Sequence, residues 1–93
     1  MTGNFNIEYM TQIWQEGDQF VAHAMPLDVM SSGVTVEAAR EALTEAVELF
    51  LVTTAEAGNL EDVLVESGYE FKDESWHSPV WIATERRAAA VGV

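Results

Sequence analysis

The two histidines are the residues best suited by type to acid–base chemistry or metal binding at neutral pH. His23 lies inside a short β-prone run, with no second histidine, cysteine or carboxylate at ligand spacing, and His77 lies between Trp76 and Ser78. The chain contains no cysteine, which excludes disulfides and thiolate metal sites. We therefore interpret His23 as an exposed or interface histidine rather than as a general base or metal ligand, and His77 likewise.

Carboxylates are abundant, but their spacing matches no motif that we know to carry chemistry. The D-x-D-x-D-G pattern of a calcium loop is absent, as are a phosphate-cradling glycine loop and the G-x-S-x-G sequence of a serine hydrolase. An acidic chain offers many chance pairs of carboxylates, so a pair alone indicates no hydrolase. We expect no catalytic residue, no bound metal, no cofactor and no enzymatic activity.

The charge of the chain restricts its partners. Acidic residues outnumber basic ones 16 to 4, for a net charge of -12. Such a surface repels nucleic acid and anionic lipid and attracts a basic protein. The longest apolar run, residues 49–52, is far short of the roughly 20 residues that span a membrane, and the first residues lack the pattern of a signal peptide. We expect a cytoplasmic protein that binds neither nucleic acid nor membrane directly.

The first third of the chain predicts a β-hairpin. Residues 5–14 alternate between two faces, Gly17-Asp18 suits a two-residue turn, and residues 20–25 form a second β-prone run. In the resulting register Ile13 faces Ala22, and a second face forms that is too apolar to be merely solvated. We predict that this second face contacts another chain, through Trp14, Val21, His23 and Met25.

A third strand and a long helix are expected next. We place the strand around residues 27–31, interpret Gly33 as a turn residue, and expect Thr35 to cap a helix that has Glu37 in its first turn. The helix ends near Gly58-Asn59. Its apolar arc comprises Ala39, Ala42, Leu43, Ala46, Val47, Leu49 and Phe50. Its acidic side, with Glu41, Glu45 and Glu48, is either a patch for a basic partner or an ordinary solvated helix face.

The remaining residues predict a short helix and one more strand. Residues 60–68 form the helix, a strand begins at residues 69–71, and residues 79–84 (PVWIAT) form the last strand. The final residues extend that strand or fray. Trp14, Trp76 and Trp81 suit either an interface or ordinary packing. The whole chain, residues 1–93, forms one α+β domain.

Residues 5–71 resemble the HicB-like antitoxin family. The family pattern combines a glycine turn, an aromatic strand residue, a Pro/Leu loop, S-x-G-x-T-x-E-E-A and L-x-E-A-x-E-L-Y/F-L. The corresponding residues are Gly17, Phe20, Pro26-Leu27, residues 31–39 (SSGVTVEAA) and residues 43–51 (LTEAVELFL). Residues 58–71 (GNLEDVLVESGYEF) are similar to the segment G-T-L-E-E-V-L-E-E-A-G-F of one branch. The chain departs from the family at Ala38, which replaces a glutamate, and in lacking the L-P-G-C loop.

The resemblance implies a fold and a role. The fold is a β-β-β-α-β core, in which one long helix packs on a small, mostly antiparallel sheet. The role is to bind and mask a small basic ribonuclease toxin of the HicA type. Many members add a C-terminal DNA-binding domain, but the segment after Phe71 is too short for one, so we expect a solitary domain. An open sheet edge also favours a homo-oligomer, and the alternative function is an orphan self-associating domain that binds another protein or a small ligand.

Overall fold

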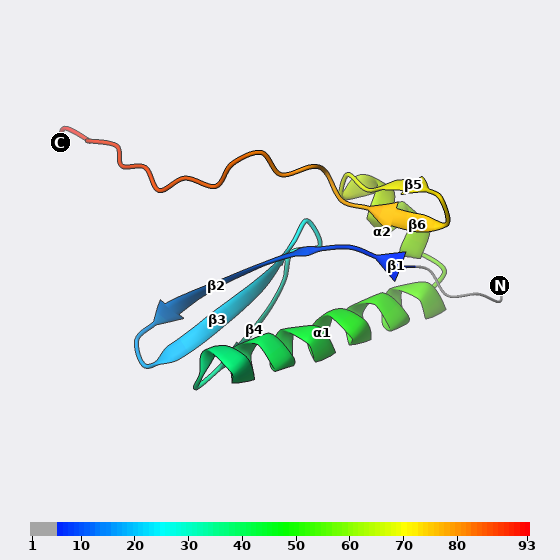
Figure 1. Cartoon of the computed structure of the whole chain (residues 1–93), viewed down its shortest axis with the longest axis horizontal. Coiled ribbons are helices and arrows are strands. Elements are labelled where there is room, and N and C mark those ends of the chain that lie inside the picture. Colours follow the sequence, from blue (N-terminus) through cyan, green and yellow to red (C-terminus); the bar gives the residue numbers. More distant parts are fainter. Residues whose placement is uncertain (1–5) are drawn as a thin grey trace.

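The computed structural model describes residues 6–93, which form two three-stranded sheets and two helices (Figure 1). One sheet has the strand order β2-β3-β4 and is antiparallel, and the other has the order β1-β6-β5. The elements are β1 (Asn6–Ile7), β2 (Met10–Glu16), β3 (Gln19–Met25), β4 (Val29–Gly33), α1 (Val36–Glu56), α2 (Leu60–Glu66), β5 (Glu70–Lys72) and β6 (Ser75–His77). The predicted α+β class is confirmed, with a second small sheet beyond the expected core.

The predicted hairpin is confirmed with its register. β2 and β3 pair residue by residue, with Ile13 opposite Ala22 and Trp14 opposite Val21. The turn between them contains Gly17 at a φ of 61°, a conformation that glycine adopts without steric penalty. Alternation and a glycine turn were therefore enough to fix this pairing.

The first predicted strand is wrong in one respect, because it is interrupted at Glu8 and Tyr9. Residues 6–7 leave the hairpin and pair in parallel with β6, and the Glu8 backbone N–H donates to the Trp76 carbonyl at 3.2 Å. The buried hydroxyl of Tyr69 donates to the Glu8 carbonyl. Because these partners are distant in the sequence, one alternating run is divided between two sheets. Phe5, which the prediction assigns to the same run, lies outside the described residues.

The third strand begins two residues later than predicted. Residues 26–28 form a turn with Asp28 at a φ of 61°, and Leu27 is buried within it. Gly33 is the last residue of β4 rather than a turn residue. A Cβ at this position would lie 2.6 Å from the Ala39 nitrogen and 2.7 Å from the Ala38 carbonyl carbon. Glycine is needed here because the start of α1 packs directly against the strand.

α1 begins where the sequence predicts and covers one face of the β2-β3-β4 sheet. The Thr35 hydroxyl accepts a hydrogen bond from the Ala38 N–H at 3.0 Å, and Glu37 forms an ion pair with Arg40. The buried stripe consists of Ala39, Leu43 and Val47, which pack with Ala22 and Ala24 of the sheet. Leu49 does not join the stripe, because it lies well round the helix from it and is 68% exposed.

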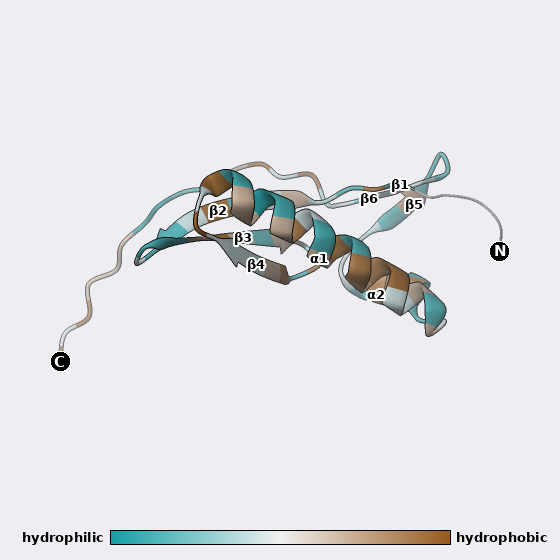
Figure 2. Ribbon diagram, turned by 90° about the horizontal axis from the view of Figure 1, so that it is seen from below, coloured by the Kyte–Doolittle hydropathy of each residue, from teal (hydrophilic) through white to brown (hydrophobic). Residues whose placement is uncertain are grey.

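α2 and the smaller sheet extend the core at the end of α1 (Figure 2). Gly68, at a φ of 95°, follows α2, and Leu64, Tyr69 and Trp76 are buried in one cluster with α1. Trp76 is therefore a packing residue. Burial, and then the negative charge of Glu8, raise the pKa of Tyr69 to about 12.

The C-terminal segment differs most from the prediction. The last strand is β6, which follows a turn at Asp73 and Glu74, both with positive φ. Residues 78–93 form no helix or strand, so the strand predicted at residues 79–84 is wrong. Pro79 lacks the N–H that would continue the pairing of β6. Among the described residues, no helix is long and apolar enough to cross a membrane.

Candidate protein-binding face

The face of the β2-β3-β4 sheet opposite α1 carries four of the seven residues that the sequence predicts to bind a partner. We call it the outer face. Because side chains alternate along a strand, the register assigns to it Met10, Gln12, Trp14, Val21, His23, Met25, Met30 and Ser32. Three of its large apolar side chains are open to solvent: Met10 is 45%, Trp14 37% and Met30 56% exposed. Such a group of exposed apolar side chains, rimmed by polar ones, is typical of a protein-binding surface.

Trp14, His23 and Asp28 form a connected group on this face. The Trp14 and His23 rings meet edge to face, with centroids 6.1 Å apart and planes at 72°. The His23 Nε2 lies 2.7 Å from Oδ1 of Asp28, and the two side chains are 15% and 81% exposed. The carboxylate fixes the ring, and the ring in turn supports one edge of the tryptophan. The tryptophan is thus held in a defined orientation before any partner arrives, which lowers the entropy lost on binding.

The predicted binding residues fall on two sides of the molecule. Trp14, Val21, His23 and Met25 lie together on the outer face, with Val21 buried beneath its neighbours. The exposed glutamates of α1, Glu41, Glu45 and Glu48, belong to the helix that covers the other face. A single compact partner therefore cannot contact both groups at once.

Met30 is a member of the outer face that sequence reasoning missed. It pairs across from His23, and it was overlooked because the third strand was predicted without a register against the hairpin. The signal that could have found it is alternation, since Met30 points away from the core when its neighbour Val29 packs against it. Trp81 belongs to neither sheet; the segment from residue 78 runs on the outer side of the sheet without joining it (Figure 1).

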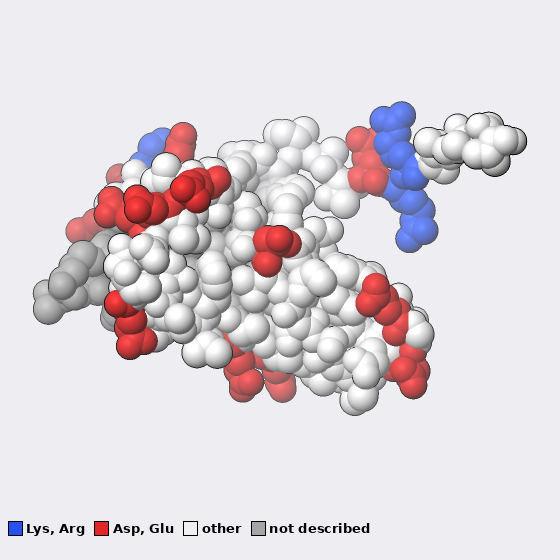
Figure 3. Space-filling view, turned by 180° about the vertical axis from the view of Figure 1, so that it is seen from behind, with Lys and Arg blue, Asp and Glu red and all other residues white. Residues whose placement is uncertain are grey.

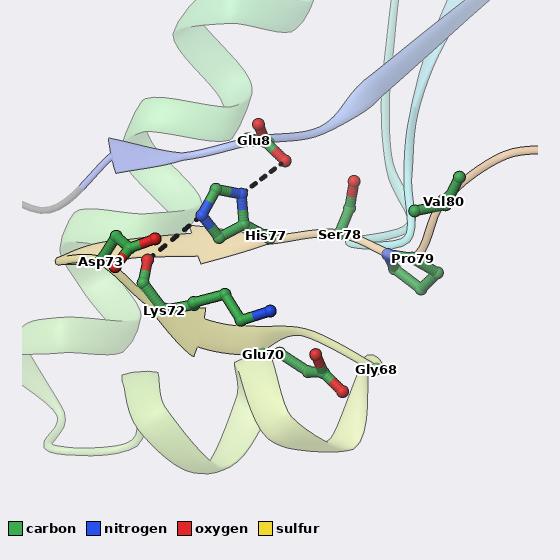
Figure 4. Close-up of a pocket in the computed structure, with 9 residues that line it drawn as sticks. All are labelled: Glu8, Gly68, Glu70, Lys72, Asp73, His77, Ser78, Pro79 and Val80. Atoms are coloured by element: carbon green, nitrogen blue, oxygen red, sulfur yellow. Dashed lines mark hydrogen bonds and ion pairs between the residues drawn. The ribbon is translucent and has the colours of Figure 1, made fainter.

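A second feature is a hollow of about 600 Å³ beside His77 (Figure 4). The His77 Nδ1 lies 3.3 Å from Oε1 of Glu8, and its Nε2 lies 3.2 Å from the Lys72 carbonyl oxygen. The lining residues are Glu8, Gly68, Glu70, Lys72, Asp73, His77, Ser78, Pro79 and Val80. The imidazole, on β6, thus contacts β5 and the residue that follows β1.

The hollow lacks the geometry of a hydrolase site. Both ring nitrogens of His77 face oxygen acceptors on Glu8 and Lys72, so neither is directed at the neighbouring Ser78 hydroxyl as a general base would be. Within residues 6–93, no three His, Asp or Glu side chains are grouped to hold a metal ion. The His77 contacts hold strands together; His23 lies on the other sheet.

Acidic side chains are distributed over the body of the domain (Figure 3). Basic side chains are few: the chain has four lysines and arginines, and two of them, Arg86 and Arg87, belong to the C-terminal segment. The field around the domain is therefore negative and attracts a positively charged macromolecule over a distance set by salt.

No family model, curated protein or solved structure matches this chain. The HicB-like resemblance consequently stays a prediction.

Proposed function

We propose that this chain is an antitoxin-like binding protein that masks a small basic ribonuclease by direct contact. It acts stoichiometrically and performs no chemistry of its own. The observation that carries the proposal is the outer face, where Trp14, Met10 and Met30 remain exposed beside a fixed histidine.

The composition of the outer face supports a protein partner. Trp is among the residues most enriched in interface hot spots, and methionines adapt their shape to a partner's surface. The outer face carries no lysine or arginine, so it provides no positive charge for a phosphate backbone. Its exposed apolar side chains, Met10, Trp14 and Met30, can pack against an apolar or aromatic side chain of another protein.

The charge supports a basic partner. A net charge of -12 raises the association rate of a positively charged protein and suppresses binding of acidic ones. Ribonucleases that bind RNA need a basic surface for that purpose. An acidic domain seated over such a surface competes with RNA for it.

The test is affinity capture from the source organism with the tagged full chain, at about 50 mM and 500 mM salt. The proposal predicts that one small basic protein is retained at low salt and binds more weakly at high salt. The same protein should be toxic when it is expressed alone. A matched bait with Trp14→Ala should lose it. Capture of the same proteins by both baits would refute binding through the outer face.

The second candidate function is an orphan self-associating domain that binds another protein or a small ligand. The exposed apolar segment after β6 favours self-association. The hollow beside His77 offers a place for a small ligand. A purified chain that captures only itself, with no small basic protein encoded beside it, would favour this alternative.

A further inference from the structure

The free edge of β2 is unusually open for an edge strand. The strand order leaves β2 at the margin of its sheet, and all seven of its residues pair one-to-one with β3 without a bulge. Natural edge strands are commonly protected by lysine, proline, a bulge or a covering element. β2 reads MTQIWQE and contains none of these, whereas the opposite edge strand, β4, has the most extensive packing with α1.

A segment that lacks a partner strand leaves the domain nearby. β6 pairs in parallel with β1, which continues into β2, so the residues after β6 start beside the beginning of β2. Val80 is 85% and Ile82 90% exposed, although residues 80–84 (VWIAT) are rich in strand-forming side chains. Figures 1 and 2 both show the C-terminus projecting past the β2–β3 turn. We call residues 78–93 the C-terminal arm.

We propose that residues 80–84 of the C-terminal arm add as an antiparallel strand to the free edge of β2 in a second copy of the chain, with reciprocal exchange in a two-fold dimer. The arm runs in the same direction as its own β2 (Figure 1). A two-fold axis across the strands reverses the partner's arm, which makes the exchanged pairing antiparallel.

The arm's own β2 is the poorer acceptor. Continuing the parallel register of Asn6 with Ser75 would place Pro79 opposite Met10 and Glu85 opposite Glu16. The proline has no N–H to donate, and like charges directly opposite destabilise a strand pair. The described arm accordingly makes no ladder with β2.

One antiparallel register suits the second copy on both faces. With Ile82 opposite Ile13, Trp81 lies beside Trp14 on the outer face, and residues 80–84 extend from Gln15 to Thr11 of β2. They stop short of Glu8, whose backbone N–H bonds Trp76 of its own β6. Aromatic cross-strand pairs stabilise a sheet.

The proposal does not rest on the ribonuclease-binding function, although Trp14 takes part in both, and it is tested on the purified full chain without a ribonuclease. Sedimentation equilibrium should give a dimer of the 10.3 kDa chain. Ile82→Pro should raise the dimer dissociation constant at least about tenfold, because it removes an N–H from the exchanged strand. The matched control Ala89→Pro, later in the arm, should leave it unchanged. Circular dichroism shows whether both variants keep their fold.

Cysteine pairing identifies which chain accepts the arm, since the native chain has no cysteine. In the proposed register Thr11 lies opposite Thr84. An equimolar mixture of Thr11→Cys and Thr84→Cys chains should form a mixed disulfide dimer under mild oxidation, more than about ten times faster than a mixture of Thr11→Cys and Ala89→Cys. A monomer at all concentrations, a dimer unaffected by Ile82→Pro, or a Thr11→Cys/Thr84→Cys double variant that forms only an intrachain disulfide would each overturn the proposal.

Discussion

Trp14 and His23 meet edge to face on the outer face of the sheet, with ring centroids 6.1 Å apart. They come from adjacent strands whose register follows from a two-residue turn at Gly17 and Asp18. Asp28, 2.7 Å from the histidine, comes from the next turn along the chain. The hairpin turn, the strand register and the turn that carries Asp28 thus place a partly exposed tryptophan against a histidine that is paired with a carboxylate.

Replacing this tryptophan should weaken partner binding more than it weakens the fold. We expect Trp14→Ala to lower affinity for the captured ribonuclease at least about thirtyfold, which corresponds to a hot-spot loss of about 2 kcal/mol. The free energy of unfolding should fall by only about 1 kcal/mol, since the side chain is partly exposed on an edge strand. Calorimetric titration and urea unfolding measure the two. Leu49→Ala, which removes an exposed leucine from α1, is the control and should leave affinity unchanged.

The acidic side of α1 should act on the rate of association only. Changing Glu41, Glu45 and Glu48 together to glutamine should lower the association rate constant several-fold at low salt and leave the dissociation rate constant unchanged. The difference should vanish near 0.5 M salt because of screening. Stopped-flow mixing measures these rates.

The matched control removes three charges from α2 instead, at Glu61, Asp62 and Glu66. It should slow association by a similar factor, because both triple variants act through the net charge of the domain. A faster dissociation for the α1 variant alone would show that the partner contacts this helix, contrary to binding through the outer face.

Gly33→Ala should destabilise the domain by about 1 to 3 kcal/mol, as expected for an overpacked contact. The new methyl group would meet the backbone of Ala38 and Ala39 at less than van der Waals distance, so the start of α1 must shift. Urea unfolding measures the change. Gly92→Ala, where a Cβ has no neighbour within 4 Å, should be neutral, and equal midpoints for the two variants would contradict this role of Gly33.

Tyr69 should make stability decrease at alkaline pH. Its pKa is raised from 10.0 to about 12 in the folded chain, so the unfolded chain loses this proton first as pH rises. The contribution of Tyr69 to the free energy of unfolding is complete below pH 10. It falls by up to about 2 to 3 kcal/mol between pH 10 and 12. Urea unfolding at pH 9 and pH 11.5 measures it.

Tyr69→Phe provides the comparison for that titration. The variant loses the hydrogen bond to the Glu8 carbonyl, which costs about 1 kcal/mol at neutral pH, but its stability should fall less between pH 9 and 11.5 than that of the native chain. The same decrease in both proteins would show that other groups cause the alkaline loss.

Local signals predicted most of the fold. The hairpin register followed from alternation and a glycine turn, and the start of α1 followed from Thr35, which caps it as expected. These features depend on residues close together in the sequence. The parallel pairing of β1 with β6 does not, because it joins Asn6 to Ser75, and nothing near either residue signals the other.

A residue of the outer face could be predicted from the sequence only where the pairing of its strand could be predicted. Trp14 and His23 follow from the hairpin, whereas Met30 depends on the pairing of β4 with β3. The α1 glutamates were grouped with them by charge alone, and only the packing of the helix on the opposite face separates the two sets. In the C-terminal arm the sequence predicted a strand that the structure lacks. Residues 80–84 have side chains typical of a strand, but a strand also needs a neighbouring strand to pair with.

The most direct test of the central claim is an inhibition titration of the captured small basic ribonuclease. RNA cleavage would be followed as the full chain is added at a fixed enzyme concentration well above the dissociation constant. We predict that cleavage falls linearly to zero at a fixed stoichiometric ratio, and that Trp14→Ala at the same concentrations leaves most of it intact. Undiminished cleavage at saturating native chain, or equal inhibition by native chain and Trp14→Ala, would contradict an antitoxin that binds through the outer face.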